Sequence, residues 1–426
     1  MTDDDTGRRH GGGSLVPAPS ALAAVGVGTA VLALVLLGLN LRVVFGSASA
    51  TMTEIRQDYG LGAGSAALVT TGPVLCLGVF ALAGPRLLRR WTVPVVLTGC
   101  LVAVSVGTAL RGAPWWSSLV FGTVVAGIGV AIANVLGPVL IRLLFPHRIG
   151  SMTGLFTALV SASAGLAAGV TVPIDSALFH DWRVTLMAWS IPSALAVAAM
   201  ALLSWRYRVV AQSATAGTRT AATTPVTDLV RSPVARAVTG FMGLQSLLAY
   251  SLIAWLPTVY RDRGMAPDHA GLVLTSLSVS SIATALTVPV LATRLRRQSA
   301  LAVTVVALSV AGLTGVLVGD TGMATVSAVL LGLGQGGQLS LALTLMNLRS
   351  RSAATTTSLS TMAQSIGYLV AALGPVVSGA IHGATGTWTV PLVALVVVTV
   401  PMAVCGWVAG RDTPVRDTPS ESPLAS

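Results

Sequence analysis

The sequence predicts an all-α membrane protein in which twelve transmembrane helices form two pseudo-symmetric six-helix bundles. Three observations support this fold class. Apolar runs of about 20 residues, each long enough to cross a bilayer as a helix, recur along nearly the whole chain. The arginines gather in every second connection between these runs, and the two halves of the chain resemble each other.

The composition excludes a water-soluble protein. Of the 426 residues, 54% are hydrophobic and 9% are charged, and the mean hydropathy is +0.82. The formal net charge of +11 is carried by arginine alone. Because these arginines lie in short loops, they indicate membrane topology and not nucleic-acid binding. The three cysteines lie in apolar segments without metal-ligand spacing.

Twelve spans follow from the apolar runs. We expect them at roughly 21–55, 62–84, 92–111, 115–144, 149–174, 183–205, 235–259, 267–292, 299–318, 321–347, 353–381 and 387–409. The first run is too long for a signal-peptide core and has no evident cleavage site, so we expect it to remain as a helix. The domains are then a cytoplasmic flexible N-terminal tail (1–20), an N-terminal six-helix bundle (21–205), a cytoplasmic linker (206–234), a C-terminal six-helix bundle (235–410) and a cytoplasmic C-terminal tail (411–426).

The arginines give the orientation of the spans. With the N-terminus in the cytoplasm, nineteen arginines fall on the cytoplasmic side, and Arg42 is left unassigned. The outer side receives Arg56, Arg111, Arg183, Arg261 and Arg263. Cytoplasmic loops of membrane proteins carry an excess of basic residues, and an odd number of missed spans would scramble the pattern. We therefore expect a multi-pass protein of the plasma (inner) membrane with both termini in the cytoplasm.

The two halves of the chain also resemble each other in sequence. Residues 60–90 and 264–297 both begin with a Gly-led outer loop, pass through one apolar span and end in a basic inner loop. "GIGVAIAN" (127–134) resembles "GLGQGGQL" (332–339), and a basic turn follows each. Two repeated six-helix halves are typical of a transporter that binds near the midplane and rocks one half against the other.

Six stretches of the chain resemble a known family. They are "LNLR" (39–42), "TTGPVLCLGVFALAGPRLLRR" (70–90), "GIGVAIANVLGPVLIRLLFPHRIGSMTGLFT" (127–157), "WRVTLMAW" (182–189), "GLQSLLAYSLIAWLP" (243–257) and "GLGQGGQLSLAL" (332–343). Taken jointly they resemble the major facilitator superfamily, and within it the branch of cyanate and 2-nitroimidazole porters. The resemblance covers all but the tails and the central loop. It implies the major facilitator fold, with spans one, four, seven and ten lining the cavity.

Two features depart from the pattern of that superfamily. The loop "GPRLLRRW" (84–91) lacks the acidic residue that the superfamily usually carries between spans two and three. The Gly-Pro signature common in span five of proton-driven drug exporters is missing from "SASAGLAAGVTVP" (161–173), and a similar "LVAALGPVVSG" (369–379) is found in span eleven instead. The first departure speaks against gating by the usual salt-bridge arrangement, and the second disfavours drug export.

Arg42 is the sharpest single signal. The first span continues from near Ala21 toward Glu54, which puts Arg42 near mid-depth. A charge there costs about 2.5–3.5 kcal/mol on insertion scales, so it should face a wet cavity or a partner. A guanidinium is always charged and donates in a planar fork that suits carboxylate-like or linear anions. The sequence thus indicates an anion site, the alternative being that Arg42 snorkels outward or bonds to carbonyls of another helix.

The acidic residues leave Arg42 without an obvious buried counter-ion, because none of the fourteen falls in the middle third of a predicted span. The usual membrane-embedded carboxylate that carries protons is therefore missing, and Glu54 and Asp175, at outer helix ends, are poor substitutes. Asn40 points about 200° away from Arg42 on a regular helix. One of the two is expected to make a helix–helix hydrogen bond, and Asn40 is the better candidate for that role.

Other polar residues recur at mid-span. With Arg42 and Asn40, the candidate substrate-binding residues are Asn134 in span four, Gln245, Tyr250 and Trp255 in span seven, Gln335 and Gln338 in span ten, and Gln364 and Tyr368 in span eleven. Interhelical hydrogen bonding is the alternative for each. A lining of amides and aromatic rings around one cation suits a small, flat, weakly hydrated substrate.

The sequence therefore predicts a secondary active transporter that works by rocking alternating access. The expected substrate is a small organic or inorganic anion or a small heteroaromatic, cyanate- or nitroimidazole-like by resemblance. The alternative is a proton-coupled multidrug or metabolite exporter, which needs a titrating group at depth. An enzyme is not expected, since no nucleophile–base pair, HExxH-like motif or phosphate loop is found. We expect a monomer in the lipid bilayer that binds a small molecule, with no nucleic acid, metal or cofactor.

Overall fold

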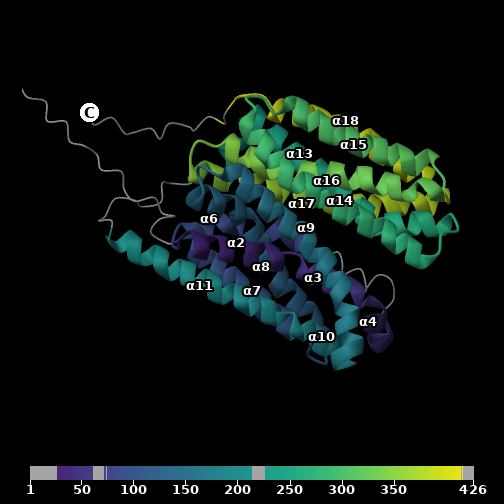
Figure 1. Cartoon of the computed structure of the whole chain (residues 1–426), viewed down its shortest axis with the longest axis horizontal. Helices are drawn as coiled ribbons and strands as arrows, with labels where there is room; N and C mark the ends of the chain where they lie inside the picture. The colour runs from purple at the N-terminus through teal and green to yellow at the C-terminus, as the bar shows by residue number, and fades with distance from the viewer. Residues whose placement is uncertain (1–25, 61–71, 73, 214–225, 414, 416–426) are drawn as a thin grey trace, which may run out of the picture.

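The computed structural model describes residues 26–60, 72, 74–213, 226–413 and 415. Within these residues all regular secondary structure is helical, with no strand. The helices are α2 (Val27–Asn40), α3 (Val43–Ala50), α4 (Met52–Tyr59), α6 (Ala83–Leu88), α7 (Val93–Leu110), α8 (Trp116–Leu144), α9 (Ile149–Ile174), η1 (Asp175–Phe179), α10 (Trp182–Ala188), α11 (Ser190–Ser213), α12 (Val226–Arg231), α13 (Pro233–Asp262), α14 (Pro267–Arg294), α15 (Ser299–Val318), η2 (Thr321–Met323), α16 (Ala324–Leu348), α17 (Ala353–Thr385) and α18 (Thr389–Ala409). Their arrangement is drawn in Figure 1.

Eleven of the described helices are long and apolar enough to cross a membrane, and each corresponds to one predicted span. The remaining predicted span, 62–84, lies partly outside the described residues, although residues 74–80 within it are helical. The predicted tail 1–20 lies wholly outside them. The predicted linker and C-terminal tail are described only in part, because 214–225, 414 and 416–426 also lie outside.

The helices form two halves that lie side by side, α2–α11 in purple to teal and α13–α18 in green to yellow (Figure 1). Within the N-terminal half, α7 packs along α8, and within the C-terminal half α15 packs along α16 and α13 along α17. The main contacts between the halves join α9 to α14 and α8 to α17. The cavity described below lies between these two halves.

Equivalent glycines let the helices of each half approach closely. A Cβ on Gly107 of α7 would lie 2.5 Å from the backbone nitrogen of Ala126 in α8. A Cβ on Gly312 of α15 would lie 2.8 Å from the backbone nitrogen of Leu331 in α16. Both members of the second pair lie 205 positions after their mates in the first. Small residues at such crossings allow backbone contact between membrane helices, and here the two halves share the same crossing.

The first span is not the continuous helix that the sequence predicts. α2 ends at Asn40 and α3 begins at Val43, with Leu41 and Arg42 in a turn between them. An interruption inside the membrane is tolerated where side chains meet the freed backbone groups. Here a tighter turn meets part of them, because Leu41 N donates to Gly38 O at 3.4 Å. The expectation of an unbroken helix through Arg42 is therefore wrong.

The halves contact each other at the end that carries the arginine-rich connections. A Cβ on Gly154 of α9 would lie 2.8 Å from Leu286 O in α14. Arg142 Nη1 of α8 donates to Asn347 O of α16 at 2.5 Å. At the opposite end, α4 and α10 of the N-terminal half lie apart from the C-terminal half (Figure 1). The interface between the halves is therefore tight at one end of the molecule.

Candidate substrate site

A cavity of about 100 Å³ lies between the two halves. The N-terminal half lines it with Arg42 and, from α9, Ser161 and Ala164. The C-terminal half lines it with Gln245, Ser246, Ala249, Tyr250, Leu252 and Ile253 of α13, Leu277, Ser278 and Ser281 of α14, and Gln335, Gly336 and Leu339 of α16. The lining is thus a single guanidinium from one half facing uncharged polar, small and aromatic residues of the other.

Arg42 reaches this cavity at the point where the first span is interrupted, directly before α3. Its guanidinium carbon lies 5.6 Å from the centre of the Tyr250 ring in α13. The Tyr250 ring in turn packs edge-on against Tyr368 of α17, with 6.4 Å between the ring centres. A cation over an aromatic face gains about 0.5–2 kcal/mol. The cation of the N-terminal half therefore lies against aromatic rings of the C-terminal half.

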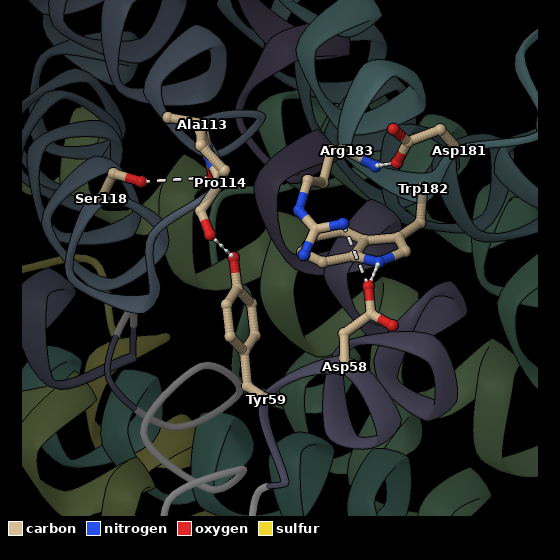
Figure 2. Close-up of polar contacts among 8 residues, drawn as sticks. All are labelled: Asp58, Tyr59, Ala113, Pro114, Ser118, Asp181, Trp182 and Arg183. Atoms are coloured by element: carbon tan, nitrogen blue, oxygen red, sulfur yellow. Dashed lines mark hydrogen bonds and ion pairs between the residues drawn. The ribbon is translucent and has the colours of Figure 1, made fainter.

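The ion pair found among the described residues lies away from the cavity, at the far end of the N-terminal half. Figure 2 shows that Asp58 Oδ2 accepts a hydrogen bond from Trp182 Nε1 at 2.7 Å and pairs with Arg183 Nη1 at 3.1 Å. Beside them, Tyr59 Oη donates to Pro114 O at 3.1 Å. This network ties α4 to α10 and to the connection before α8. In the part of the chain that the structure describes, Arg42 has no carboxylate within ion-pair distance.

The C-terminal half repeats part of this outer network. Trp388 Nε1 donates to Asp262 Oδ2 at 2.7 Å and so ties the start of α18 to the end of α13. The Trp388 ring also stacks on His382, with 3.9 Å between the ring centres. Residue 389 is a threonine, so the position after this tryptophan carries no positive charge to match Arg183.

Two residues of the cavity hold polar atoms without a partner. Tyr250 Oη and both amide atoms of Gln335, Oε1 and Nε2, are buried and make no hydrogen bond. The Gln335 side chain is only 7% exposed. A buried polar atom left unpaired costs about 1–3 kcal/mol. Hydrogen bonds from a bound molecule to these atoms would remove this cost.

Gln245 lines the same cavity with part of its hydrogen-bonding capacity already used. Its Nε2 donates to Met242 O at 3.1 Å and to Ser246 Oγ at 2.7 Å. Tyr368 is 3% exposed and contacts Tyr250 without lining the cavity. The cavity therefore brings together four of the sequence candidates, which are Arg42, Gln245, Tyr250 and Gln335.

Two other candidates lie outside the lining and join helices within one half. Asn40 links α2 to α11, because its Nδ2 also donates to Pro192 O at 3.4 Å and its Oδ1 accepts from Ser193 Oγ at 2.8 Å. Gln338 links α16 to α15, since its Nε2 donates to Val305 O and Ser309 Oγ at 3.1 and 2.9 Å. Asn40 therefore makes the helix–helix contact for which it was the better candidate, and Arg42 is the one that faces the cavity.

Three further candidates also lie outside the lining. Gln364 Nε2 donates to Asn134 O at 3.1 Å across the interface between the halves, and Asn134 Nδ2 donates to Val130 O of its own helix at 3.0 Å. Trp255 Nε1 donates to Pro375 O at 2.8 Å, and its ring lies 5.3 Å from that of Trp388. Gln364 is therefore placed to hold the two halves together.

Sequence reasoning missed three serines of the cavity, which are Ser161, Ser278 and Ser281. Ser161 lies on α9, and Ser278 and Ser281 lie three residues apart on α14, which puts them on one face of that helix. The pair at this spacing in an otherwise apolar span is the signal that could have found them. Serine hydroxyls that bond back to their own helix, as Ser281 Oγ does to Ser278 O at 2.7 Å, are common in membrane helices, so the signal is weak.

The structure also buries Arg111, which the topology places at the outer side. Its side chain is 0% exposed after the end of α7. Its Nη1 donates to Ser47 Oγ of α3 at 3.3 Å, whereas Nε and Nη2 make no hydrogen bond. The sequence offers no signal for this burial, since Arg111 stands next to Gly112 at the end of an apolar run, as a loop arginine would.

Comparison with known proteins places this fold and cavity in a family. Residues 30–372 match the model of the Major Facilitator Superfamily. The chain is 34% identical to an uncharacterized transporter, YycB, of Bacillus subtilis (strain 168), over 88% of this chain and 91% of that protein. It is 34% identical to the 2-nitroimidazole transporter of Escherichia coli (strain K12), over 88% and 94%. Identity to the cyanate transport protein CynX of the same organism is 29%, over 82% and 88%.

Solved structures agree with the fold. The proton:xylose symporter XylE superposes with a TM-score of 0.72 at 15% identity, covering 89% of this chain and 95% of that one. The transporter FucP, solved in an outward conformation, superposes with a TM-score of 0.66 at 12% identity, covering 91% and 100%. The predicted fold class and the predicted absence of enzymatic activity are thereby confirmed. This chain therefore belongs to the major facilitator superfamily and is a multi-pass membrane transporter of a small molecule.

Proposed function

We propose that the chain carries a small anion, or a small heteroaromatic that forms an anion, across the cell membrane by rocking its two halves around the cavity. The single observation that carries this proposal is Arg42. It lines the cavity at the interruption of the first span, and no carboxylate of the described residues lies within ion-pair distance of it. A negative charge on the substrate would provide the missing counter-ion.

The surroundings of Arg42 support an anion more than a cation or a sugar. Tyr250 already lies against the guanidinium, which offsets part of the cost of keeping a charge at depth. The guanidinium also interacts with the hydroxyl groups of Tyr250 and Tyr368, and its fork of five N–H donors leaves others for a planar acceptor such as a carboxylate or nitro group. Among the described residues the lining contains no second charged side chain, so nothing there offsets the repulsion between Arg42 and a cationic substrate.

The size of the cavity supports a small substrate. Pockets for drug-sized ligands typically measure about 300–1,000 Å³, against about 100 Å³ here. Two relatives are named as transporters of small molecules, 2-nitroimidazole and cyanate, which agrees with that size. We therefore propose cyanate-like or nitroimidazole-like molecules as the size class of the substrate.

The arginine distribution supports an orientation with both termini in the cytoplasm. In that orientation the tight contact between α9 and α14 is at the inner side, and the outer network of Asp58 faces the outside. Nothing in this arrangement calls for a second copy of the chain, so we propose a monomer. The direction of transport follows the gradient that drives it.

A proton-coupled exporter is the weaker alternative. It needs a titrating group that faces the substrate, and the lining residues include no Asp, Glu or His. Asp175 lies at an outer helix end, where its Oδ1 accepts a hydrogen bond from Thr185 Oγ1 at 2.7 Å. Glu54 lies at the exposed outer end of the first span. Neither carboxylate faces the cavity.

Counterflow in proteoliposomes tests the proposal. We expect vesicles loaded with unlabelled anion to accumulate labelled cyanate, a small aromatic carboxylate or 2-nitroimidazole. Arg42→Gln should reduce this uptake roughly 10–100-fold, because a hydrogen bond to a charged group contributes about 1.5–3 kcal/mol. Arg208→Gln, which changes an exposed arginine at the end of α11, is the matched control and should transport normally. Exchange of a hydrophobic cation, with none of these anions exchanged, would contradict the proposal.

A further inference from the structure

Gln335 differs from the other amides of the bundle core. Neither its Oε1 nor its Nε2 has a hydrogen-bond partner, although the side chain is more than nine-tenths buried and lines the cavity. Gln338, one turn further along α16, already donates to Val305 O and Ser309 Oγ. Gln245, in the same lining as Gln335, donates to Met242 O. Gln335 is thus the amide of this lining whose donor and acceptor are both unpaired.

A planar amide presents an acceptor oxygen beside a donor nitrogen. The complementary edge carries a donor beside an acceptor, and glutamine recognises such edges by two parallel hydrogen bonds. A linear anion or a plain carboxylate offers acceptors alone. Such a molecule could accept a hydrogen bond from Gln335 Nε2. Its other acceptor atoms could not pair with Gln335 Oε1, because that atom is an acceptor as well. The unpaired oxygen of Gln335 therefore calls for a donor on the substrate.

The neighbouring groups fix where the rest of such a substrate would lie. Arg42 lines the same cavity from the opposite half and provides donors only. Tyr250 Oη, also buried and unpartnered, can donate or accept. An acceptor group of the substrate can therefore bridge Arg42 and Gln335 Nε2, while an adjacent N–H donates to Gln335 Oε1.

We propose that Gln335 is a specificity-determining residue that selects substrates with a ring N–H next to an acidic or strongly accepting group. Five-membered N–H heteroaromatics of the pyrrole and azole type carry this edge, and cyanate-like anions do not. The inference rests on the proposed function and narrows its substrate class. A site that hydrogen-bonds a donor discriminates strongly against an analogue of the same shape that lacks it.

A matched pair of ligands tests this directly in the wild-type protein. Pyrrole-2-carboxylate and furan-2-carboxylate have nearly the same shape and the same charge, and differ in whether a ring N–H or a ring oxygen stands beside the carboxylate. We expect pyrrole-2-carboxylate to inhibit counterflow at a concentration at least tenfold lower than furan-2-carboxylate. 2-Nitroimidazole should likewise inhibit more strongly than its 1-methyl derivative, in which the N–H is blocked.

Two variants test whether Gln335 causes the preference for pyrrole-2-carboxylate over furan-2-carboxylate. Gln335→Met, which keeps the length of the side chain, should bring the ratio between the two carboxylates close to one. Gln338→Met should leave the ratio unchanged and lower only the melting temperature, because Gln338 joins α16 to α15. A preference that survives in a folded Gln335→Met protein would overturn the assignment.

The outcomes separate this inference from the proposed function. Equal inhibition of the wild-type protein by both carboxylates would overturn the inference and leave anion transport standing. If neither carboxylate competes and no anion exchanges at all, the proposed function fails and the inference fails with it. The wild-type comparison needs no variant, so a substitution that prevents folding does not affect it.

Discussion

The N-terminal half of the chain and the C-terminal half share a scaffold that can be compared position by position. Their outer ends repeat in three pairs of residues that lie 204–206 positions apart: Asp58 and Asp262, Gly60 and Gly264, and Trp182 and Trp388. Each aspartate accepts a hydrogen bond from the tryptophan of its own half at 2.7 Å. Both glycines have a positive φ, 60° and 88°, which only glycine adopts readily. The two halves therefore share their outer corners as well as their helix crossings.

The same offsets reveal where the halves differ. An offset of 204 makes Arg42 equivalent to Ser246, and both line the cavity. An offset of 205 makes Gln335 equivalent to Val130, which is fully buried. One half thus supplies the cation and the other supplies the free amide and the aromatic ring. The two halves therefore share their helix crossings and outer corners but carry different side chains at the cavity. A substrate would contact a different kind of side chain in each half.

The largest expected effect on stability concerns a crossing that the halves do not share. A Cβ on Gly336 would lie 1.9 Å from Ser281 O of α14, whereas the equivalent position in the N-terminal half is Ala131. Gly336→Ala must therefore push α14 away from α16 at the cavity, at a cost of about 1–3 kcal/mol or more. Thermal unfolding of the purified protein measures it.

The control for this prediction is Gly271→Ala in α14. A Cβ there meets nothing within 4 Å, so the change should move stability by no more than about 1 kcal/mol. Equal melting temperatures for the Gly336 and Gly271 variants would show that the two helices do not cross as closely as the structure has them.

The second prediction concerns the buried arginine, which also breaks the equivalence of the halves. At the offset of 205 positions that relates α7 to α15, Arg111 corresponds to Val316, a fully buried apolar residue. Because two of its three guanidinium nitrogens have no partner, Arg111→Met should raise the free energy of unfolding by about 1–3 kcal/mol. Arg183→Met, which removes an ion pair, should lower it slightly.

Chemical or thermal unfolding of both arginine variants decides this point. A large loss of stability in Arg111→Met would mean that the guanidinium is held by partners the structure lacks. A gain would show that the N-terminal half carries a destabilising charge at a position where the C-terminal half has a buried valine, Val316.

The smallest expected effect compares the two outer aspartates. Asp58 and Asp262 each accept from a tryptophan, but only Asp58 also pairs with an arginine, Arg183. Both side chains of that ion pair are partly exposed, so the pair contributes about 0–1 kcal/mol and is screened by salt. Asp58→Asn should therefore lower the melting temperature slightly more than Asp262→Asn. The difference should vanish in about 1 M salt, and a difference that persists there would contradict an electrostatic origin.

Much of the fold could be predicted from the sequence because its signals are long and repeated. Each apolar run contains about 20 residues, and the arginines alternate over the whole chain. A single atypical residue therefore does not change the predicted number or orientation of the spans. The break at Leu41 and Arg42 could not be predicted, because neither Gly nor Pro stands at these two positions.

The cavity residues were harder to separate from packing residues. Gln335 and Gln338 lie three positions apart on α16 and therefore near one face, which periodicity alone cannot divide. The position of α15 separates the two roles. Gln338 donates hydrogen bonds to Val305 and Ser309 of α15, whereas Gln335 lines the cavity. Such differences of one helical turn depend on tertiary packing, which no local pattern records.

The most direct test of the account combines the charge of the ligand with the charge of Arg42. Binding of pyrrole-2-carboxylate and of its neutral carboxamide is measured by thermal shift on the wild-type protein and on Arg42→Gln. We predict that the variant loses roughly 10–100-fold in affinity for the carboxylate and that its affinity for the amide changes little. An equal loss for both ligands, or no loss for the carboxylate, would contradict the claim that Arg42 binds the negative charge of the substrate.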